Sequence, residues 1–159
     1  MDKKNFIRKI IFGSDHAGYL LKEALKLHLS TDSNENKYEI IDCGPFSESK
    51  VDYPDYAKAV ALEVIKNPEN RGILVCGTGI GISIAANKLN GIRCGLVHDH
   101  FTAQLSRDHN DCNVVAIGAG LIGKELAKNI VDVFLSTKFS EGERHITRIE
   151  KIRAIEKEN

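Results

Sequence analysis

The chain has 159 residues, a length that suits one domain, and we expect residues 1–159 to form it. Hydrophobic residues make up 42% and charged residues 28%, and 22 basic side chains balance 22 acidic ones. A balanced chain has no overall field to attract nucleic acid or an anionic membrane, and no apolar run is long enough to cross a bilayer. We therefore predict a protein that binds neither, in which any anion site is local.

Five short runs rich in Ile and Val predict β-strands, and each ends in Gly or Asp. In chain order they are KIIFGSD (9–15), YEIIDCG (38–44), GILVCGTG (72–79), IRCGLVHD (92–99) and NVVAIGAG (113–120). The runs are continuous rather than alternating, which is typical of strands buried on both faces.

Helical patterns lie between these strands, over 18–29, 54–66, 81–88, 100–110 and 123–136. Alternation of this kind predicts an α/β fold, a three-layer α/β/α Rossmann-like domain with a five-stranded parallel sheet. The polar segment 30–37 is expected to be a surface loop. A C-terminal helix at about 143–157 carries one apolar stripe, which needs a surface on this domain or on a second subunit: Ile146, Ile149, Ile152 and Ile155.

Four cysteines occur without any C-x-x-C pair, and the N-terminus lacks the apolar region of a signal peptide. We predict a cytoplasmic protein with reduced thiols. HDH at 98–100 lacks a third ligand at a recognisable spacing, so we predict no metal site.

Ligands of open parallel sheets bind beyond the carboxyl ends of the strands. We expect titratable side chains from four strands, and from the SRDHND segment at 106–111, to gather at this one edge. Turns favour Asp, Asn and Gly in any protein, which explains the aspartates better than the histidines and a cysteine. The side chains are Asp15, His16, Asp42, Cys76, His98, Asp99, Arg107, His109, Asn110 and Asp111.

The loop 77–81 carries glycine at alternate positions between a strand and a helix, which predicts a nest of backbone N–H groups for an oxyanion. The pattern is G-x-G-x-G, neither a dinucleotide fingerprint nor a P-loop. Asp99, about 20 residues further on, still keeps a nucleotide-binding module open as an alternative.

Cys76 directly precedes this loop. A cysteine at a strand end is usually a small buried hydrophobe, and we assign Cys43, Cys94 and Cys112 to that class. Beside Cys76, however, oriented N–H groups and a helix N-terminus favour the thiolate. A thiolate next to an oxyanion nest can attack a carbonyl, or it can take a proton from the adjacent carbon while the nest stabilises an enediolate.

His16 and His109 are open to two interpretations, as polar surface residues or as proton donors near neutral pH. Arg144 and Arg148 share a helix face four residues apart, either as solvated charges or as a guanidinium pair for phosphate.

Taken together, GSDHAG, DYPDYA, CGTGIGISIAANK, AQLSRDHND and GERHITRI resemble the type-B ribose-5-phosphate isomerases, from about Ile10 to Ile155. That family also includes allose-6-phosphate isomerase and the galactose-6-phosphate isomerase subunits. The resemblance implies a Rossmann-like fold and homodimers, with the possibility of tetramers, whose active sites lie at the subunit interface.

By this resemblance Cys76 is the proton acceptor, and His109 is the proton donor that assists opening of the sugar ring. The resemblance also assigns substrate binding to Asp15, His16, Tyr53, Gly77, Thr78, Gly79, Ile80, Gly81, Asn110, Arg144 and Arg148. Two features depart from the family pattern. Gly120 stands where many members have an arginine, for which His145 is a candidate replacement, and the 30–37 segment is longer than usual.

We therefore predict an aldose–ketose isomerase that interconverts ribose 5-phosphate and ribulose 5-phosphate through an enediolate, with no metal or organic cofactor. A 6-phosphate hexose is the alternative substrate. A non-catalytic nucleotide-binding module is the alternative from another class.

Overall fold

The computed structural model describes residues 8–31 and 38–158, so most of the predicted 30–37 loop lies outside the described residues. Five parallel strands form one sheet, as the sequence predicts, and their order is β2-β1-β3-β5-β4. The strands are β1 (Arg8–Ser14), β2 (Tyr38–Asp42), β3 (Arg71–Cys76), β4 (Cys94–Leu96) and β5 (Val114–Gly118). The helices are α1 (Tyr19–Thr31), α2 (Tyr53–Val64), α3 (Ile80–Ala86), α4 (His100–Asp108), α5 (Lys124–Ser136) and α6 (Glu143–Glu158).

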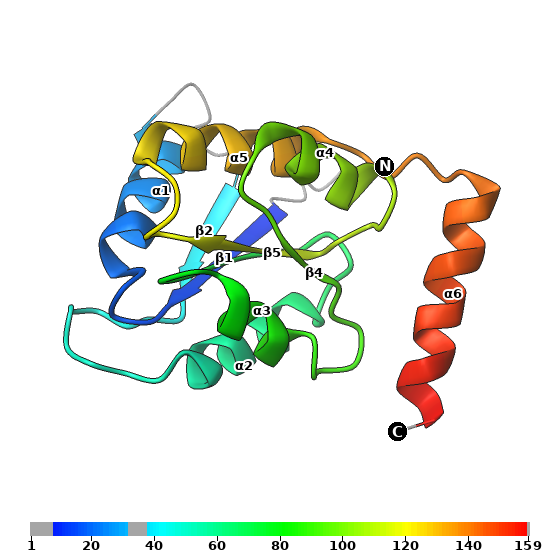
Figure 1. Ribbon diagram of the computed structural model, residues 1–159, viewed down its shortest axis with the longest axis horizontal. Helices are drawn as coiled ribbons and strands as arrows, with labels where there is room; N and C mark the ends of the chain where they lie inside the picture. Colours follow the sequence, from blue (N-terminus) through cyan, green and yellow to red (C-terminus); the bar gives the residue numbers. More distant parts are fainter. Residues whose placement is uncertain (1–7, 32–37, 159) are drawn as a thin grey trace, which may run out of the picture.

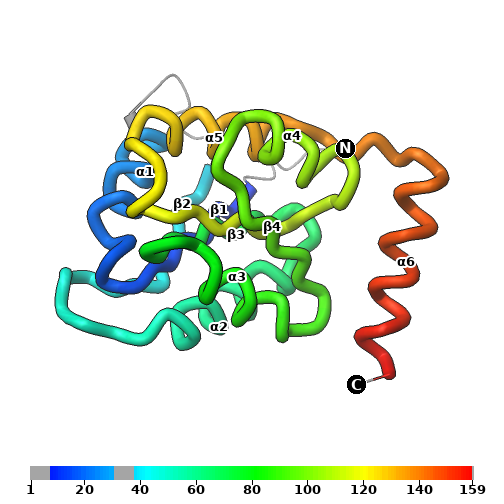
Figure 2. The backbone as a smooth tube through the Cα atoms, in the orientation of Figure 1, coloured from blue at the N-terminus to red at the C-terminus, as the bar shows by residue number. Residues whose placement is uncertain are grey.

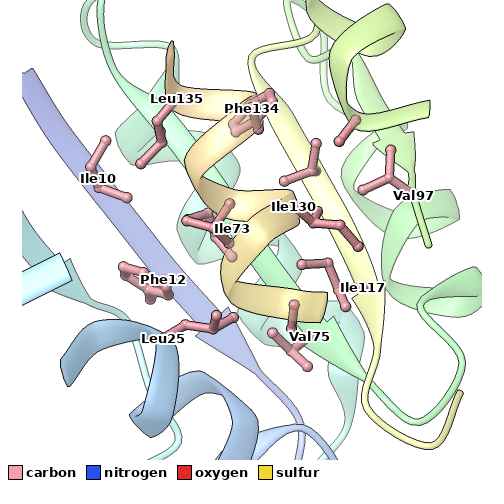
Figure 3. Packing of buried hydrophobic residues seen from close by; sticks show 14 of the residues in the cluster. Ile10, Phe12, Leu25, Ile73, Val75, Val97, Ile117, Ile130, Phe134 and Leu135 are labelled. Atoms are coloured by element: carbon pink, nitrogen blue, oxygen red, sulfur yellow. The ribbon is translucent and has the colours of Figure 1, made fainter. Parts of the chain in front are cut away.

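Helices cover both faces of the sheet and make three layers (Figure 1). The α1, α4 and α5 helices pack on one face, and α2 and α3 pack on the other. Ile10, Phe12, Ile73 and Val75 of the sheet and Phe134 of α5 belong to one buried cluster on the first face (Figure 3). The central strands bury side chains on both faces, which explains why their sequences are continuous apolar runs.

The sixth helix stands apart from the three layers and is joined to them through residues 137–142 (Figure 2). Ile149 is buried, whereas Ile146, Ile152 and Ile155 are 39%, 41% and 58% exposed. A groove of about 900 Å³ separates the C-terminal half of α6 from β4 and α4. Other residues of this chain therefore cover only part of the predicted apolar stripe of α6.

Candidate active site

The strand order reverses between β1 and β3, which are neighbours in the sheet although β2 lies between them in sequence. The chain leaves β1 toward α1 on one face, and it leaves β3 toward α3 on the other. The two connections diverge at the carboxyl edge, which is where open α/β sheets bind ligands. Asp15, His16 and Cys76 all lie at this edge, as predicted.

Cys76 ends β3, and its side chain is buried. The backbone N–H of Gly79 donates to Cys76 Sγ at 3.1 Å. The thiol is thus held beside the loop and is not merely packed in the core.

Gly79 has φ +77 and forms the N-cap of α3. A Cβ atom there would approach Leu96 Cδ1 to 2.7 Å and the Ile117 carbonyl carbon to 3.0 Å. Only glycine combines this left-handed backbone with so little space, so the residue fixes the turn that points the N–H toward Cys76. Thr78 and Ile80 on either side are exposed.

Tyr53 begins α2 and lies over the glycine loop. A Cβ atom on Gly81 would lie 2.5 Å from the Tyr53 ring carbon Cζ and 2.7 Å from its hydroxyl oxygen. The ring is 38% exposed, so it closes one side of the loop and still faces solvent. Tyr53, to which the resemblance assigns substrate binding, therefore lies beside the glycine loop.

Asp15 and His16 follow β1 and are held in different ways. Asp15 is buried, and its Oδ1 accepts a hydrogen bond from Gly18 N–H at 3.0 Å. His16 Nδ1 lies 3.2 Å from Val51 O and 3.3 Å from Val51 N, so the tautomer decides whether the nitrogen donates or accepts. In either tautomer, Nε2 of His16 has no partner among the described residues and is open to a ligand.

A fully buried lysine supports this edge, a feature that the sequence analysis missed. Lys22 Nζ donates to both Asp42 carboxylate oxygens, at 2.7 and 2.8 Å, and to Pro45 O at 2.8 Å. Burial alone would raise the pKa of Asp42, but hydrogen bonds from Lys22 and Lys26 hold that pKa below its ordinary value. The signal was present, because Lys22 occupies the same helix face as Leu25 and Leu29.

His109 and Asn110 do not lie at the carboxyl edge, and our prediction that SRDHND gathers there was wrong. The α4 helix starts after β4 at the carboxyl edge and runs back, so its end lies at the amino edge. Gly72 N, near the start of β3, donates to Asn113 O at 2.9 Å. A rise of about 3.3 Å per residue puts Cys76 about 13 Å beyond Gly72 along the strand. Cys76 and His109 of one chain therefore form no pair.

The amino edge has its own cluster of basic side chains. The rings of His109 and His145 stack, with centroids 4.2 Å apart and an interplanar angle of 13°. Arg144 Nε donates to His145 Nε2 at 3.3 Å, and Arg148 lies one helical turn further on. Burial, and then the positive charges of His109, Arg144 and Arg148, lowers the pKa of His145. Both arginines are exposed and form no ion pair with a described residue.

Gly120 lies at the carboxyl edge, where its N–H donates to Gly77 O at 2.9 Å. His145, our candidate for the missing arginine, belongs to the amino edge of the same chain, so it does not occupy the place next to Gly120. Asp99 is the N-cap of α4, and its Oδ1 accepts from Thr102 N–H at 2.7 Å. This capping role accounts for Asp99 without a nucleotide.

Within residues 8–31 and 38–158, no group of three or more His, Cys, Asp or Glu side chains is arranged to hold a metal ion. No helix in the same part of the chain is both long enough and apolar enough for a membrane span.

The chain matches a family model described as Ribose/Galactose Isomerase over residues 10–152. It is 50% identical to ribose-5-phosphate isomerase B of Escherichia coli (strain K12), over 94% of this chain and 97% of that protein. The fold is similar to the solved type B ribose 5-phosphate isomerase of Trypanosoma cruzi, with a TM-score of 0.90, 44% identity and coverage of 96% and 99%. It is also similar to ribose-5-phosphate isomerase B of Mycoplasma genitalium with bound ribulose-5-phosphate, with a TM-score of 0.88, 40% identity and coverage of 95% and 97%.

Proposed function

The chain belongs to the ribose/galactose isomerase family, and from this premise we propose a reaction carried by Cys76 and the glycine loop. The activity is that of an aldose–ketose isomerase, a ribose-5-phosphate isomerase of type B. The observation that carries the residue assignment is the buried Cys76 thiol, which accepts an N–H bond from the nest that follows it.

In the proposed reaction, the Cys76 thiolate takes the proton from C2 of open-chain ribose 5-phosphate. The electron pair of that C–H bond forms a C1–C2 double bond, and negative charge develops on O1. Backbone N–H groups of residues 77–81 stabilise this enediolate. Cys76 then returns the proton to C1 while the O2–H proton passes to O1, which gives ribulose 5-phosphate and restores the thiolate. No cofactor is needed.

The remaining roles are shared between the two edges of the sheet. Asp15, His16 and Tyr53 bind the sugar at the carboxyl edge. His109 donates the proton that assists ring opening, Asn110 binds near the enediolate, and Arg144 and Arg148 bind the phosphate. A guanidinium pair one helical turn apart suits the charge of a phosphate group.

These roles require two copies of the chain, because the edges of one chain lie too far apart to meet. We propose a homodimer in which the amino edge of each subunit completes the carboxyl edge of its partner. The 900 Å³ groove beside Asn110 supports a second copy as its occupant, since Leu96, Leu105 and Ile152 line it. Tetramers of such dimers remain compatible with this arrangement. All four cysteines are free, and we place the enzyme in the cytoplasm, where Cys76 stays reduced.

The substrate is tested by measuring kcat/KM of the purified protein for ribose 5-phosphate and for allose 6-phosphate. We expect ribose 5-phosphate to be strongly preferred. A preference for allose 6-phosphate would change the proposed substrate but leave the proposed isomerisation reaction unchanged. Thermal stabilisation by ATP or NAD, without turnover of either sugar, would instead support a nucleotide-binding module.

A further inference from the structure

A second pocket lies at the amino edge, away from the carboxyl edge that holds Cys76. Its volume is about 300 Å³, and the end of α2, the segments around 91–93 and 111–113, and α6 enclose it. The charged residues that line it are Arg71, Arg93, Asp111 and Arg153.

Arg71 is the most deeply placed of these residues, with 7% of its surface exposed. Its Nη1 donates to the carbonyl oxygens of Pro68 and Asn70, both at 2.8 Å. No carboxylate among the described residues lies within 4.0 Å of its guanidinium. Its other N–H groups have no described partner and are not fully buried, and Arg71 itself lines the pocket.

The charge of Arg71 persists at neutral pH. Burial, followed by the nearby positive charges of Arg107 and Arg8, lowers the pKa of Arg71 to about 10. A buried cation without a carboxylate is costly, and a bound anion removes that cost.

Among the residues that line the pocket, arginines outnumber carboxylates. Asp111 is its only carboxylate among the described residues, and both oxygens are already used. Oδ2 accepts from Arg93 at 2.9 Å, and Oδ1 accepts from Arg107 at 2.8 Å. Arg153 on α6 is exposed and has no ion pair with a described residue. Three arginines thus line the pocket beside one carboxylate, while Glu69 acts on Arg71 from outside the lining and Glu156 Oε1 accepts from Gly91 N–H at 3.1 Å.

We propose that this pocket is a second anion site, separate from the substrate site, which binds the phosphate group of a small metabolite or inorganic phosphate itself. Guanidinium groups bind phosphate through paired N–H donors. A dianion matches this excess of lining arginines better than a monocarboxylate does. The volume is at the lower end of the range for small-molecule sites, which excludes a dinucleotide.

The neighbours of the pocket suggest what an occupant does. Arg93 Nε donates to Asn110 O at 3.2 Å and to Asp111 O at 3.0 Å, so Arg93 holds the turn that follows His109. Arg153 lies on the helix that carries Arg144 and Arg148. An anion that bridges Arg71, Arg93 and Arg153 fastens this helix and this turn to the sheet. An effect of this anion on the isomerase reaction rests on the proposed function, whereas the anion site itself does not.

The site is tested by calorimetric titration with inorganic phosphate at constant ionic strength. The full-length Arg144→Gln/Arg148→Gln protein provides the background, because it lacks the proposed substrate-phosphate ligands. We expect this protein to bind one phosphate per chain. Adding Arg153→Gln removes one charge-assisted contact and weakens binding about tenfold or more. Adding Lys151→Gln makes the same charge change on the same helix outside the pocket and leaves the affinity unchanged.

Absence of phosphate binding in the background protein would overturn the proposal, as would equal effects of Arg153→Gln and Lys151→Gln. Repeating the titration with glycerol 3-phosphate identifies the source. Tighter binding than that of phosphate supports an ester as the occupant, and equal binding supports phosphate itself. If the wild-type protein shows no isomerase activity while Arg153-dependent binding remains, the proposed function fails and the second site stands.

Discussion

The two edges of the sheet both collect titratable side chains, but they are built in different ways. At the carboxyl edge, backbone loops leave the strands directly, so Cys76 and Asp15 are buried and bonded to N–H groups. At the amino edge, the functional candidates stand at helix ends, with Arg144 and Arg148 exposed. The carboxyl edge thus buries Cys76 and Asp15, whereas Arg144 and Arg148 at the amino edge face solvent. In our proposal the first edge stabilises charge that develops during the reaction, and the second serves a ligand held by another surface.

The largest effect is expected at Cys76. Cys76→Ala removes the proposed base, and we expect kcat to fall by about 10³-fold or more. Substrate binding should be largely retained, because the loop and the arginines are unchanged. Single-turnover kinetics and a binding titration measure the two quantities separately. Cys43→Ala is the control and should leave kcat unchanged; a Cys76→Ala enzyme with a tenth of wild-type kcat would remove Cys76 from this role.

A second large effect concerns the stability of the carboxyl edge. Lys22→Met removes the buried partner of Asp42 and should lower the free energy of unfolding by about 3 kcal/mol. This is the lower end of the range for a broken buried pair, because Lys26 still contacts Asp42. Urea denaturation measures the loss. Lys26→Met, at a side chain that is 23% exposed, should cost less; an equal cost would show that burial does not set the strength of this pair.

Substitution of the exposed arginines at the amino edge should weaken substrate binding rather than lower the free energy of unfolding. Arg144→Gln removes a charge-assisted bond to the substrate phosphate, and we expect kcat/KM to fall by the equivalent of about 1.5–3 kcal/mol. Part of the loss can appear in kcat, because remote binding energy is used in the transition state. Lys151→Gln on the same helix is the control. Unchanged inhibition by inorganic phosphate in both Arg144→Gln and Arg148→Gln would place the phosphate elsewhere.

The smallest effect is a pH dependence at the amino edge. The pKa of His145 is lowered in the folded protein, so the unfolded chain takes up a proton at a higher pH than the folded chain does. The free energy of unfolding should therefore fall as the pH drops below the ordinary histidine value of about 6.5. His145→Phe keeps a ring beside His109 but cannot titrate. Urea denaturation from pH 7 to pH 5 should show a shallower loss for this variant, and parallel curves would contradict the assignment.

The sequence was sufficient for the five-stranded sheet and for the places of Asp15 and Cys76 at its carboxyl edge, because the signals there are local. Continuous apolar runs predicted the strands, and the alternating glycines predicted the loop between strand and helix that follows Cys76. The placement of His109 failed because it depends on the path of a helix. Nine residues of α4 rise about 13 Å, which carries the chain back across the sheet to its other edge.

Two other features depend on tertiary contacts that no local pattern contains. Lys22 lies on the apolar face of α1, yet the sequence does not show that Asp42 and Pro45 lie next to its ammonium group. The stack of His145 on His109 joins α6 to the end of α4 across 36 residues, and the sequence alone predicted only the helices that carry the rings.

The central claim is that the two edges form one active site only when they come from two copies of the chain. The most direct test mixes inactive Cys76→Ala with inactive His109→Ala protein under conditions that exchange subunits. A mixed dimer has one site with both defects and one site with neither. Random mixing at equal amounts makes half of the dimers mixed, so about a quarter of wild-type activity should return, given two-fold symmetry. No recovery, despite proven subunit exchange, would show that Cys76 and His109 act within one chain, and it would contradict the account.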